Sequence, residues 1–209
     1  MTDIKFNKIL IFINSLVPLL LLAWDAFNGN LGANPINFFL QTTGFLTIIF
    51  LFISLSITPL RKFFGWNQLV KFRRMLGLYA FFYVCMHFTI YIWLDHFFDW
   101  ARIWQDIAKR PYVTVGFAAF VMLVPLALTS NKFSIRKLTG KRWQQLHWLV
   151  YPAAICGVVH YYWLVKADIR QPVIYAVVLA VLLGVRIFYK IKPQPRSPRE
   201  YKPDLQTSK

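Results

Sequence analysis

Long apolar runs alternate with short polar or basic connections along most of the chain. A helix needs about 20 mainly apolar residues to cross a bilayer, and six runs approach or reach that length. They cover residues 9–24, 38–57, 72–94, 112–129, 145–165 and 172–188. The pattern predicts an all-α integral membrane protein whose residues 1–190 form one six-transmembrane-helix bundle. The remaining residues, 191–209, are basic and rich in proline, a composition that predicts a disordered tail.

The connections between the runs differ in character. Residues 28–37 are predicted to form a short loop, because they contain the turn-forming residues Gly29, Gly32 and Pro35. Residues 95–111 predict a longer amphipathic loop. The first run begins like a signal peptide, but no small-residue cleavage site follows Trp24, so an uncleaved helix is favoured.

Positive charge lies mainly on one side of the predicted bundle. With six crossings, the two termini and the connections after the second and fourth runs share a side. Those two connections hold Arg61, Lys62, Lys71, Arg73, Arg74, Lys132, Arg136, Lys137, Lys141 and Arg142. The opposite loops hold only Arg102, Lys109, Arg110, Lys166 and Arg170. Because basic loops stay in the cytoplasm, this bias predicts cytoplasmic termini and a multi-pass protein of the bacterial inner membrane.

Composition agrees with a membrane protein. Of the 209 residues, 57% are hydrophobic and 15% are charged, which is too apolar for an ordinary soluble domain. The net charge of +16 falls almost entirely between the apolar runs, so the lipid bilayer explains it and nucleic acid binding is not expected. Cys85 and Cys156 lie inside apolar runs and form no C-x-x-C-H motif, so covalent haem attachment is not expected. They are either small core residues or a disulfide pair.

His87 and His160 are predicted to lie at one depth. Both of their helices run outward, and His87 lies about fifteen residues, or roughly 22 Å, from its cytoplasmic start. Histidines inside a membrane are costly and mark functional sites. Two facing imidazoles would suit a b-type haem as axial ligands. Hydrogen bonding to neighbouring helices is the plainer alternative, and zinc would need ligands that the sequence does not offer at this depth.

His147 lies near the cytoplasmic end of the fifth run, and three interpretations remain open for it. It is a ligand of a second, inner haem, completed by water or by another group. Alternatively, it binds an anionic group, such as haem propionates or a flavin phosphate, together with Arg73 and Arg74. The third interpretation is an interfacial histidine beside Trp143 and Trp148. His96, by contrast, is expected at the outer interface, turned away from the other histidines.

Several motifs resemble the ferric-reductase-like transmembrane domain. The segment 73–78, RRMLGL, followed by Tyr83 and His87, resembles its third helix. A loop and the fifth helix of that domain are resembled by three further elements of this chain: Leu128-Thr129-Ser130, Trp143-x-x-Leu146-His147 with Tyr151, and His160. The resemblance covers most of the chain. It is greatest to the haem-binding membrane subunits that serve a periplasmic methionine-sulfoxide reductase.

This resemblance implies cofactors and partners that composition does not. It implies a b-type haem, one or two, on His87 and His160, with His147 as a further candidate ligand. FMN is a second candidate cofactor. The implied partners are a periplasmic molybdopterin-dependent methionine-sulfoxide reductase and, as electron donor, the quinone pool or a cytosolic flavin reductase. The NADPH oxidase branch has a second histidine on its third helix, where this chain has Arg74, which argues against two haems.

The chain is expected to transfer electrons without reducing a substrate itself. No G-x-G-x-x-G motif, Ser/His/Asp arrangement or acid–base carboxylate pair is present, so no catalytic residue is predicted. Trp100, Arg102 and Trp104 form a candidate docking surface, although interfacial anchoring explains the tryptophans equally well. Two alternatives remain: a quinol-oxidising cytochrome b subunit of another oxidoreductase, and a haem-free membrane scaffold or transporter.

Overall fold

The structure is a computed structural model that describes residues 2–165 and 167–191. Within these ranges the chain is helical and forms no strand. The helices are α1 (Thr2–Phe27), α2 (Pro35–Phe64), the 3₁₀-helix η1 (Asn67–Leu69), α3 (Val70–Ile90), the π-helix η2 (Tyr91–Asp95), α4 (Trp100–Lys109), α5 (Pro111–Leu128), α6 (Lys132–Leu146), the 3₁₀-helix η3 (His147–Leu149), α7 (Val150–Leu164) and α8 (Arg170–Ile191). Residues 192–209 of the predicted tail lie outside the described residues.

Five helical stretches are long and apolar enough to cross a membrane, so the chain is a multi-pass membrane protein. They are Ile4–Phe27, Pro35–Phe64, Asn67–Asp95, Pro111–Leu128 and Arg170–Ile191. Each coincides with one of the predicted runs. The remaining run, 145–165, folds differently at its start, where it completes α6 and forms η3. Its regular helix, α7, has 15 residues, fewer than the roughly 20 that a crossing needs.

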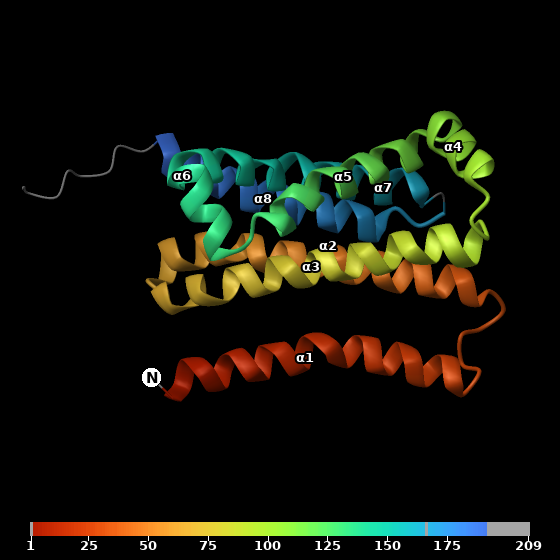
Figure 1. Cartoon of the computed structure of the whole chain (residues 1–209), viewed down its shortest axis with the longest axis horizontal. Helices are drawn as coiled ribbons and strands as arrows, with labels where there is room; N and C mark the ends of the chain where they lie inside the picture. The colour runs from red at the N-terminus through yellow and green to blue at the C-terminus, as the bar shows by residue number, and fades with distance from the viewer. Residues whose placement is uncertain (1, 166, 192–209) are drawn as a thin grey trace, which may run out of the picture.

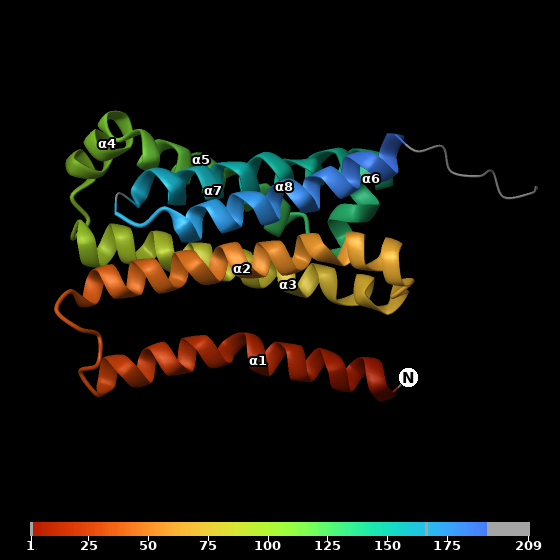
Figure 2. The ribbon, with the colours of Figure 1, turned by 180° about the vertical axis from the view of Figure 1, so that it is seen from behind.

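The long helices form three layers (Figures 1 and 2). One layer is α1 alone, the next is the pair α2 and α3, and the last contains α5, α7 and α8. The start of α1, helix α6 and the end of α8 lie at one end of the bundle, and α4 lies at the other. The basic connections therefore gather at the end where the chain begins.

Aromatic side chains fill the core between α2 and α3. Phe50 stacks on Tyr79 and Tyr83, with ring centroids 5.6 Å and 5.3 Å away. Tyr83 is completely buried. Its hydroxyl donates to the carbonyl of Ser15 at 2.6 Å, and the Tyr79 hydroxyl donates to the carbonyl of Phe12 at 3.0 Å. These two bonds attach α1 to the rest of the bundle.

Helix α2 begins and ends with recognisable signals. The Asn34 side chain accepts a hydrogen bond from the Asn37 amide, and Pro35 occupies the first turn, where its missing N–H costs nothing. Gly65 ends the helix in the left-handed region at φ 70° and donates to the Arg61 carbonyl. The predicted loop before α2 is confirmed, and Gly29 and Gly32 within it also adopt positive φ values.

Two connections between the long helices contain helices of their own, and the first of them, residues 95–111, was predicted as a loop. Residues 100–109 form α4, whose first turn is capped by the Asp99 side chain. The basic residues after the fourth run lie on α6, which is capped by Asn131 and interrupted at Thr139, where φ is 63°. In both segments the capping side chains stabilise a helix despite the high polarity of the sequence.

Candidate functional site

The imidazole rings of His87 on α3 and His160 on α7 face each other inside the bundle. Their centroids are 6.3 Å apart and their planes are nearly perpendicular, at 86°. Two residues separated by 73 positions in the sequence are therefore neighbours. His87 and His160, which were predicted to lie at one level, are in fact close neighbours.

Each of these histidines is oriented by a backbone carbonyl on a neighbouring helix. The Nδ1 atom of His87 lies 2.9 Å from the carbonyl oxygen of Leu40 on α2. The Nδ1 atom of His160 lies 2.6 Å from the carbonyl oxygen of Tyr112 on α5. A carbonyl only accepts hydrogen bonds, so Nδ1 carries the proton in both neutral rings and Nε2 presents a lone pair. Metal-binding histidines are commonly oriented in this way.

Neither Nε2 atom has a hydrogen-bond partner among the described residues. Two metal–nitrogen bonds of about 2 Å and the half-widths of two imidazoles sum to roughly 6 Å, close to the observed separation of the rings. The donors and their spacing therefore fit a metal ion with two axial imidazoles. The described residues contain no group of three or more His, Cys, Asp or Glu side chains that would hold a bare metal ion. A haem, whose porphyrin supplies four nitrogen ligands, needs only these two from the protein.

Two glycines make room for the imidazoles. A Cβ atom at Gly116 on α5 would lie 2.6 Å from His160 Nδ1 and 2.9 Å from its Cε1. A Cβ atom at Gly44 on α2 would lie 3.2 Å from both Nδ1 and Cε1 of His87. In each case the glycine is four residues after the carbonyl that binds the same ring, so one helical turn provides both the acceptor and the space. This role could not be predicted from the sequence, because a glycine in an apolar helix is ambiguous until its neighbours are known.

His147 lies elsewhere, at the start of η3, and does not join the histidine pair. Its Nε2 atom is 3.2 Å from the Thr129 hydroxyl at the end of α5. Its ring stacks on Trp143, with centroids 3.9 Å apart, and Trp143 in turn donates to the Thr129 carbonyl at 3.0 Å. These contacts hold His147 near the end of the bundle where the basic connections lie.

The two arginines predicted beside His147 have different environments. Arg73 is partly buried and lies within electrostatic range of His147, Arg61 and Arg186. Arg74 is exposed. The fold therefore brings Arg73 within electrostatic range of His147.

His96 belongs to a separate polar cluster at the end where α4 lies. The ring is buried, with 6% exposure, and is held by the Asp106 carboxylate at 3.0 Å and the Tyr91 carbonyl at 3.2 Å. Arg110 contacts the same carboxylate at 3.3 Å and donates to the Tyr112 hydroxyl. That hydrogen bond and the nearby Asp106 raise the pKa of Arg110. Among the described residues, the polar partners of His96 are Asp95, Asp106 and the Tyr91 carbonyl, and the Asp106 contact was not predicted from the sequence.

Comparison with known proteins identifies the family. The family model described as "Ferric reductase like transmembrane component" matches residues 40–158, more than half of the chain. This segment contains His87 and His147 and ends two positions before His160. No solved structure matches the chain.

Three similar relatives are each called "Protein-methionine-sulfoxide reductase heme-binding subunit MsrQ". The protein from Herminiimonas arsenicoxydans is 50% identical over 87% of this chain and 84% of its own length. The Rhodospirillum rubrum protein is 51% identical over 88% of both chains. The Azospira oryzae protein is 50% identical over 88% of this chain and 80% of its own length. The chain therefore belongs to the ferric-reductase-like transmembrane family and, within it, to the MsrQ family.

Proposed function

We propose that the chain is the membrane electron-transfer subunit of a methionine-sulfoxide reductase system, with a b-type haem on His87 and His160. The single observation that supports this most strongly is the pair of facing imidazoles, each with Nδ1 on a carbonyl and with no hydrogen-bond partner for Nε2 in the described part of the chain. The related MsrQ proteins are called heme-binding subunits, which agrees with this assignment.

The protein's own residues would do three things for the cofactor. When bound, the haem supplies one-electron transfer without a proton-transfer step on the protein. His87 and His160 would hold it between α3 and α7, and the Leu40 and Tyr112 carbonyls would keep the lone pairs directed towards it. The surrounding apolar helices would exclude water and, with the two imidazoles, would set the reduction potential. The described side chains offer no substrate-reducing centre, so the chain would pass electrons on.

Residues 1–190 would form six crossings with both ends in the cytoplasm. The fifth crossing along the chain would combine η3 with α7, whose three and 15 residues give roughly 27 Å of helix, close to the thickness of the hydrocarbon core. The clustering of α6, the chain start and the end of α8 at one end supports this topology (Figure 1). Positive residues gather there, which favours the inner membrane with that end in the cytoplasm.

A second, inner site would be built around His147, with Arg73 beside it. Fourteen residues of helix separate Arg73 from His87, or roughly 21 Å, so propionates of the outer haem would not reach this arginine. The inner group would instead be a second haem, with His147 as ligand, or an FMN whose phosphate meets Arg73. Arg74, which is exposed, would contribute only long-range positive charge.

The proposed electron acceptor is a periplasmic molybdopterin-dependent methionine-sulfoxide reductase, and the donor is quinol or a cytosolic flavin reductase. The outer haem would lie near α4, which we propose as the docking surface. Trp100 and Trp104, four residues apart and therefore on one face, are 58% and 62% exposed. Arg102 adds an exposed charge on another side of the same helix, since residues two positions apart do not share a helix face.

Reoxidation of the reduced protein tests this function directly. The purified full chain in lipid nanodiscs would be reduced with dithionite, freed of excess reductant, and mixed with the periplasmic reductase and methionine sulfoxide. We expect the reduced haem band to decay only when enzyme and sulfoxide are both present. Decay at the same rate without the enzyme, or none with it, would contradict the proposed partnership.

A further inference from the structure

A pocket of about 240 Å³ lies at the end of the bundle opposite α4. It is formed by the last turns of α2 and α8 and the first turn of α7, and its lining includes Lys62, Tyr151, Arg186, Tyr189 and Lys190. Its volume is below the roughly 300–1,000 Å³ of typical small-molecule sites. The pocket therefore suits a compact group rather than a whole nucleotide or flavin.

The pocket contains three cations and no acid. Lys62, Arg186 and Lys190 line it, and none of them forms a salt bridge with an acidic side chain in the described part of the chain. Arg73 lies within electrostatic range of Arg186 and of Arg61, and adds to the positive potential around Arg186. Like charges gathered without counter-charges repel one another, so a bound anion would stabilise this end of the bundle.

Arg186 is held by the Leu55 carbonyl, which accepts no hydrogen bond from the backbone of its own helix at position 59. Pro59 has no N–H, so the Leu55 carbonyl, four residues earlier on α2, lacks the usual hydrogen bond. Arg186 on α8 donates to this carbonyl through Nη2 at 2.6 Å and to the Tyr151 hydroxyl through Nη1 at 2.9 Å. Its Nε atom is buried without an acceptor among the described residues. Arg186 thus connects α8 to α2 and α7 through neutral oxygen atoms, and no acidic side chain among the described residues neutralises its charge.

Aromatic rings orient the two lysines. The Lys62 ammonium lies 5.7 Å from the centre of the Tyr189 ring, and the Lys190 ammonium lies 5.4 Å from that of Trp148. Such contacts favour a cation over the ring face. The outer face of α8 next to the pocket is apolar, because Val181 and Ile187 are each 58% exposed. A ligand here would meet positive charge at its head and apolar surface beside it.

We propose that this pocket binds the phosphate headgroup of an anionic phospholipid, whose acyl chains lie along the exposed face of α8. Basic pockets between membrane helices on the cytoplasmic side favour anionic lipid headgroups. Bound there, the lipid joins α2, α7 and α8, and so supports the helix that carries His160. This inference concerns stability and holds whether or not haem is bound.

Thermal unfolding of the full chain in detergent, followed by tryptophan fluorescence, tests the proposal. Dioleoyl phosphatidylglycerol, dioleoyl phosphatidylcholine and inorganic phosphate would be added at equal phosphorus concentration. We expect phosphatidylglycerol to raise the unfolding midpoint by about 5 °C, and the other two to leave it unchanged. An equal shift with inorganic phosphate would overturn the lipid assignment, as would equal shifts with the two lipids.

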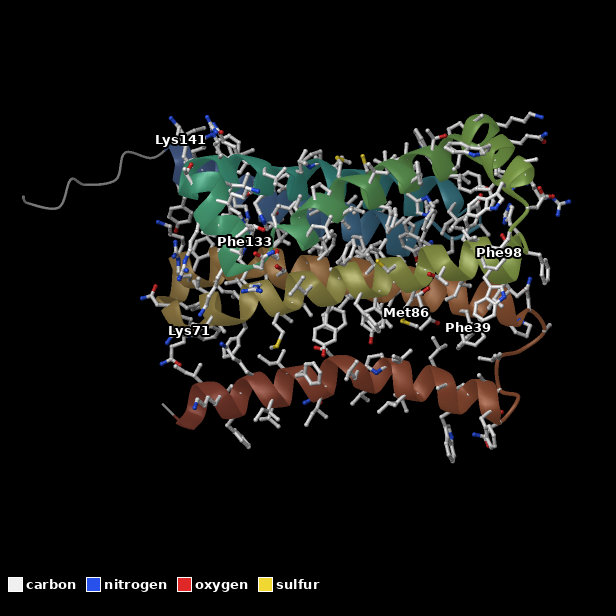
Figure 3. The ribbon with its side chains drawn as sticks, viewed as in Figure 1. Phe39, Lys71, Met86, Phe98, Phe133 and Lys141 are labelled. Atoms are coloured by element: carbon white, nitrogen blue, oxygen red, sulfur yellow. The ribbon has the colours of Figure 1, made fainter. Side chains whose placement is uncertain are left out.

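Two matched double variants locate the effect. Lys62→Gln with Lys190→Gln removes both pocket lysines, and we expect it to lose most of the phosphatidylglycerol shift. Lys71→Gln with Lys141→Gln removes two exposed lysines at the same end of the bundle but outside the pocket, and should retain the shift (Figure 3). If both variants lose the shift equally, general positive charge explains the binding and the pocket assignment is wrong. Retention of the full shift in the pocket variant would also overturn it.

Discussion

Gly116 lies against the imidazole of His160 so closely that a single added methyl group would displace the ring. The Cβ of an alanine there would lie 2.6 Å from Nδ1, a distance that real Cβ atoms essentially never show. The helical turn that closes against the histidine also provides the Tyr112 carbonyl that binds it. The direction of the His160 lone pair thus depends on the absence of a side chain on the neighbouring helix.

The first prediction concerns a graded series of glycine substitutions. Gly116→Ala should shift His160 and lower haem content severely, with an overpacking cost of about 1–3 kcal/mol. Gly44→Ala, where the new contacts are 3.2 Å, should cause a smaller loss. Gly157→Ala on α7 meets nothing within 4 Å and serves as the control. Soret absorbance per protein measures the series, and an equal loss in all three variants would show that the imidazoles do not depend on these glycines.

The second prediction concerns the histidines themselves. His87→Ala and His160→Ala should each abolish the low-spin haem spectrum, because six-coordinate ligation needs both axial nitrogens. His96→Ala is the matched control, since its ring is held by the Asp106 carboxylate and the Tyr91 carbonyl. A normal spectrum in either ligand variant would reject the assignment, and loss of haem in the control would point to a site around His96.

The third prediction separates the inner site from the outer one. We expect His147→Ala to leave the His87–His160 absorbance intact, because roughly 20 Å of helix lies between His147 and His160. Haem and FMN would be quantified per chain in the wild type and in the variant. A fall in haem from two to one would identify an inner haem, whereas a selective loss of FMN would assign the inner site to flavin. Complete loss of haem would contradict the separation of the two sites.

The fourth prediction concerns the contact between α8 and α2. Arg186→Gln should lower the unfolding midpoint, because the Leu55 carbonyl would lose the donor that replaces the missing N–H of Pro59, at a cost of about 1–3 kcal/mol. Arg170→Gln, at the other end of α8, removes an 89%-exposed side chain and should change the midpoint little. Equal midpoints in the two variants would show that Arg186 does not stabilise the helix pair.

The sequence predicted the long helices and the depth of the histidines well. Apolar runs as long as 38–57 are dictated by the bilayer, and counting along two outward-running helices is enough to place His87 and His160 at one level. The length of α7 was overestimated, because the apolar pattern does not distinguish the 3₁₀ turn η3 from regular helix.

Other features depend on contacts that no local pattern specifies. The functions of Gly44 and Gly116 follow from which imidazole lies beside them, and the bond between Arg186 and Leu55 joins residues 131 positions apart. Asp106 was assigned to a loop, so its bond to His96 was missed. The membrane favours burying such polar partners together, but only the packed helices show which ones meet.

The most direct test of the central claim is a dithionite-reduced minus oxidised optical spectrum of the purified protein, with haem quantified per chain. The facing imidazoles of His87 and His160 predict a b-type α-band and about one haem per chain, or two if His147 holds a second. A protein that purifies with no haem band, and takes up none when haem is added, would contradict the electron-transfer function and favour a membrane scaffold.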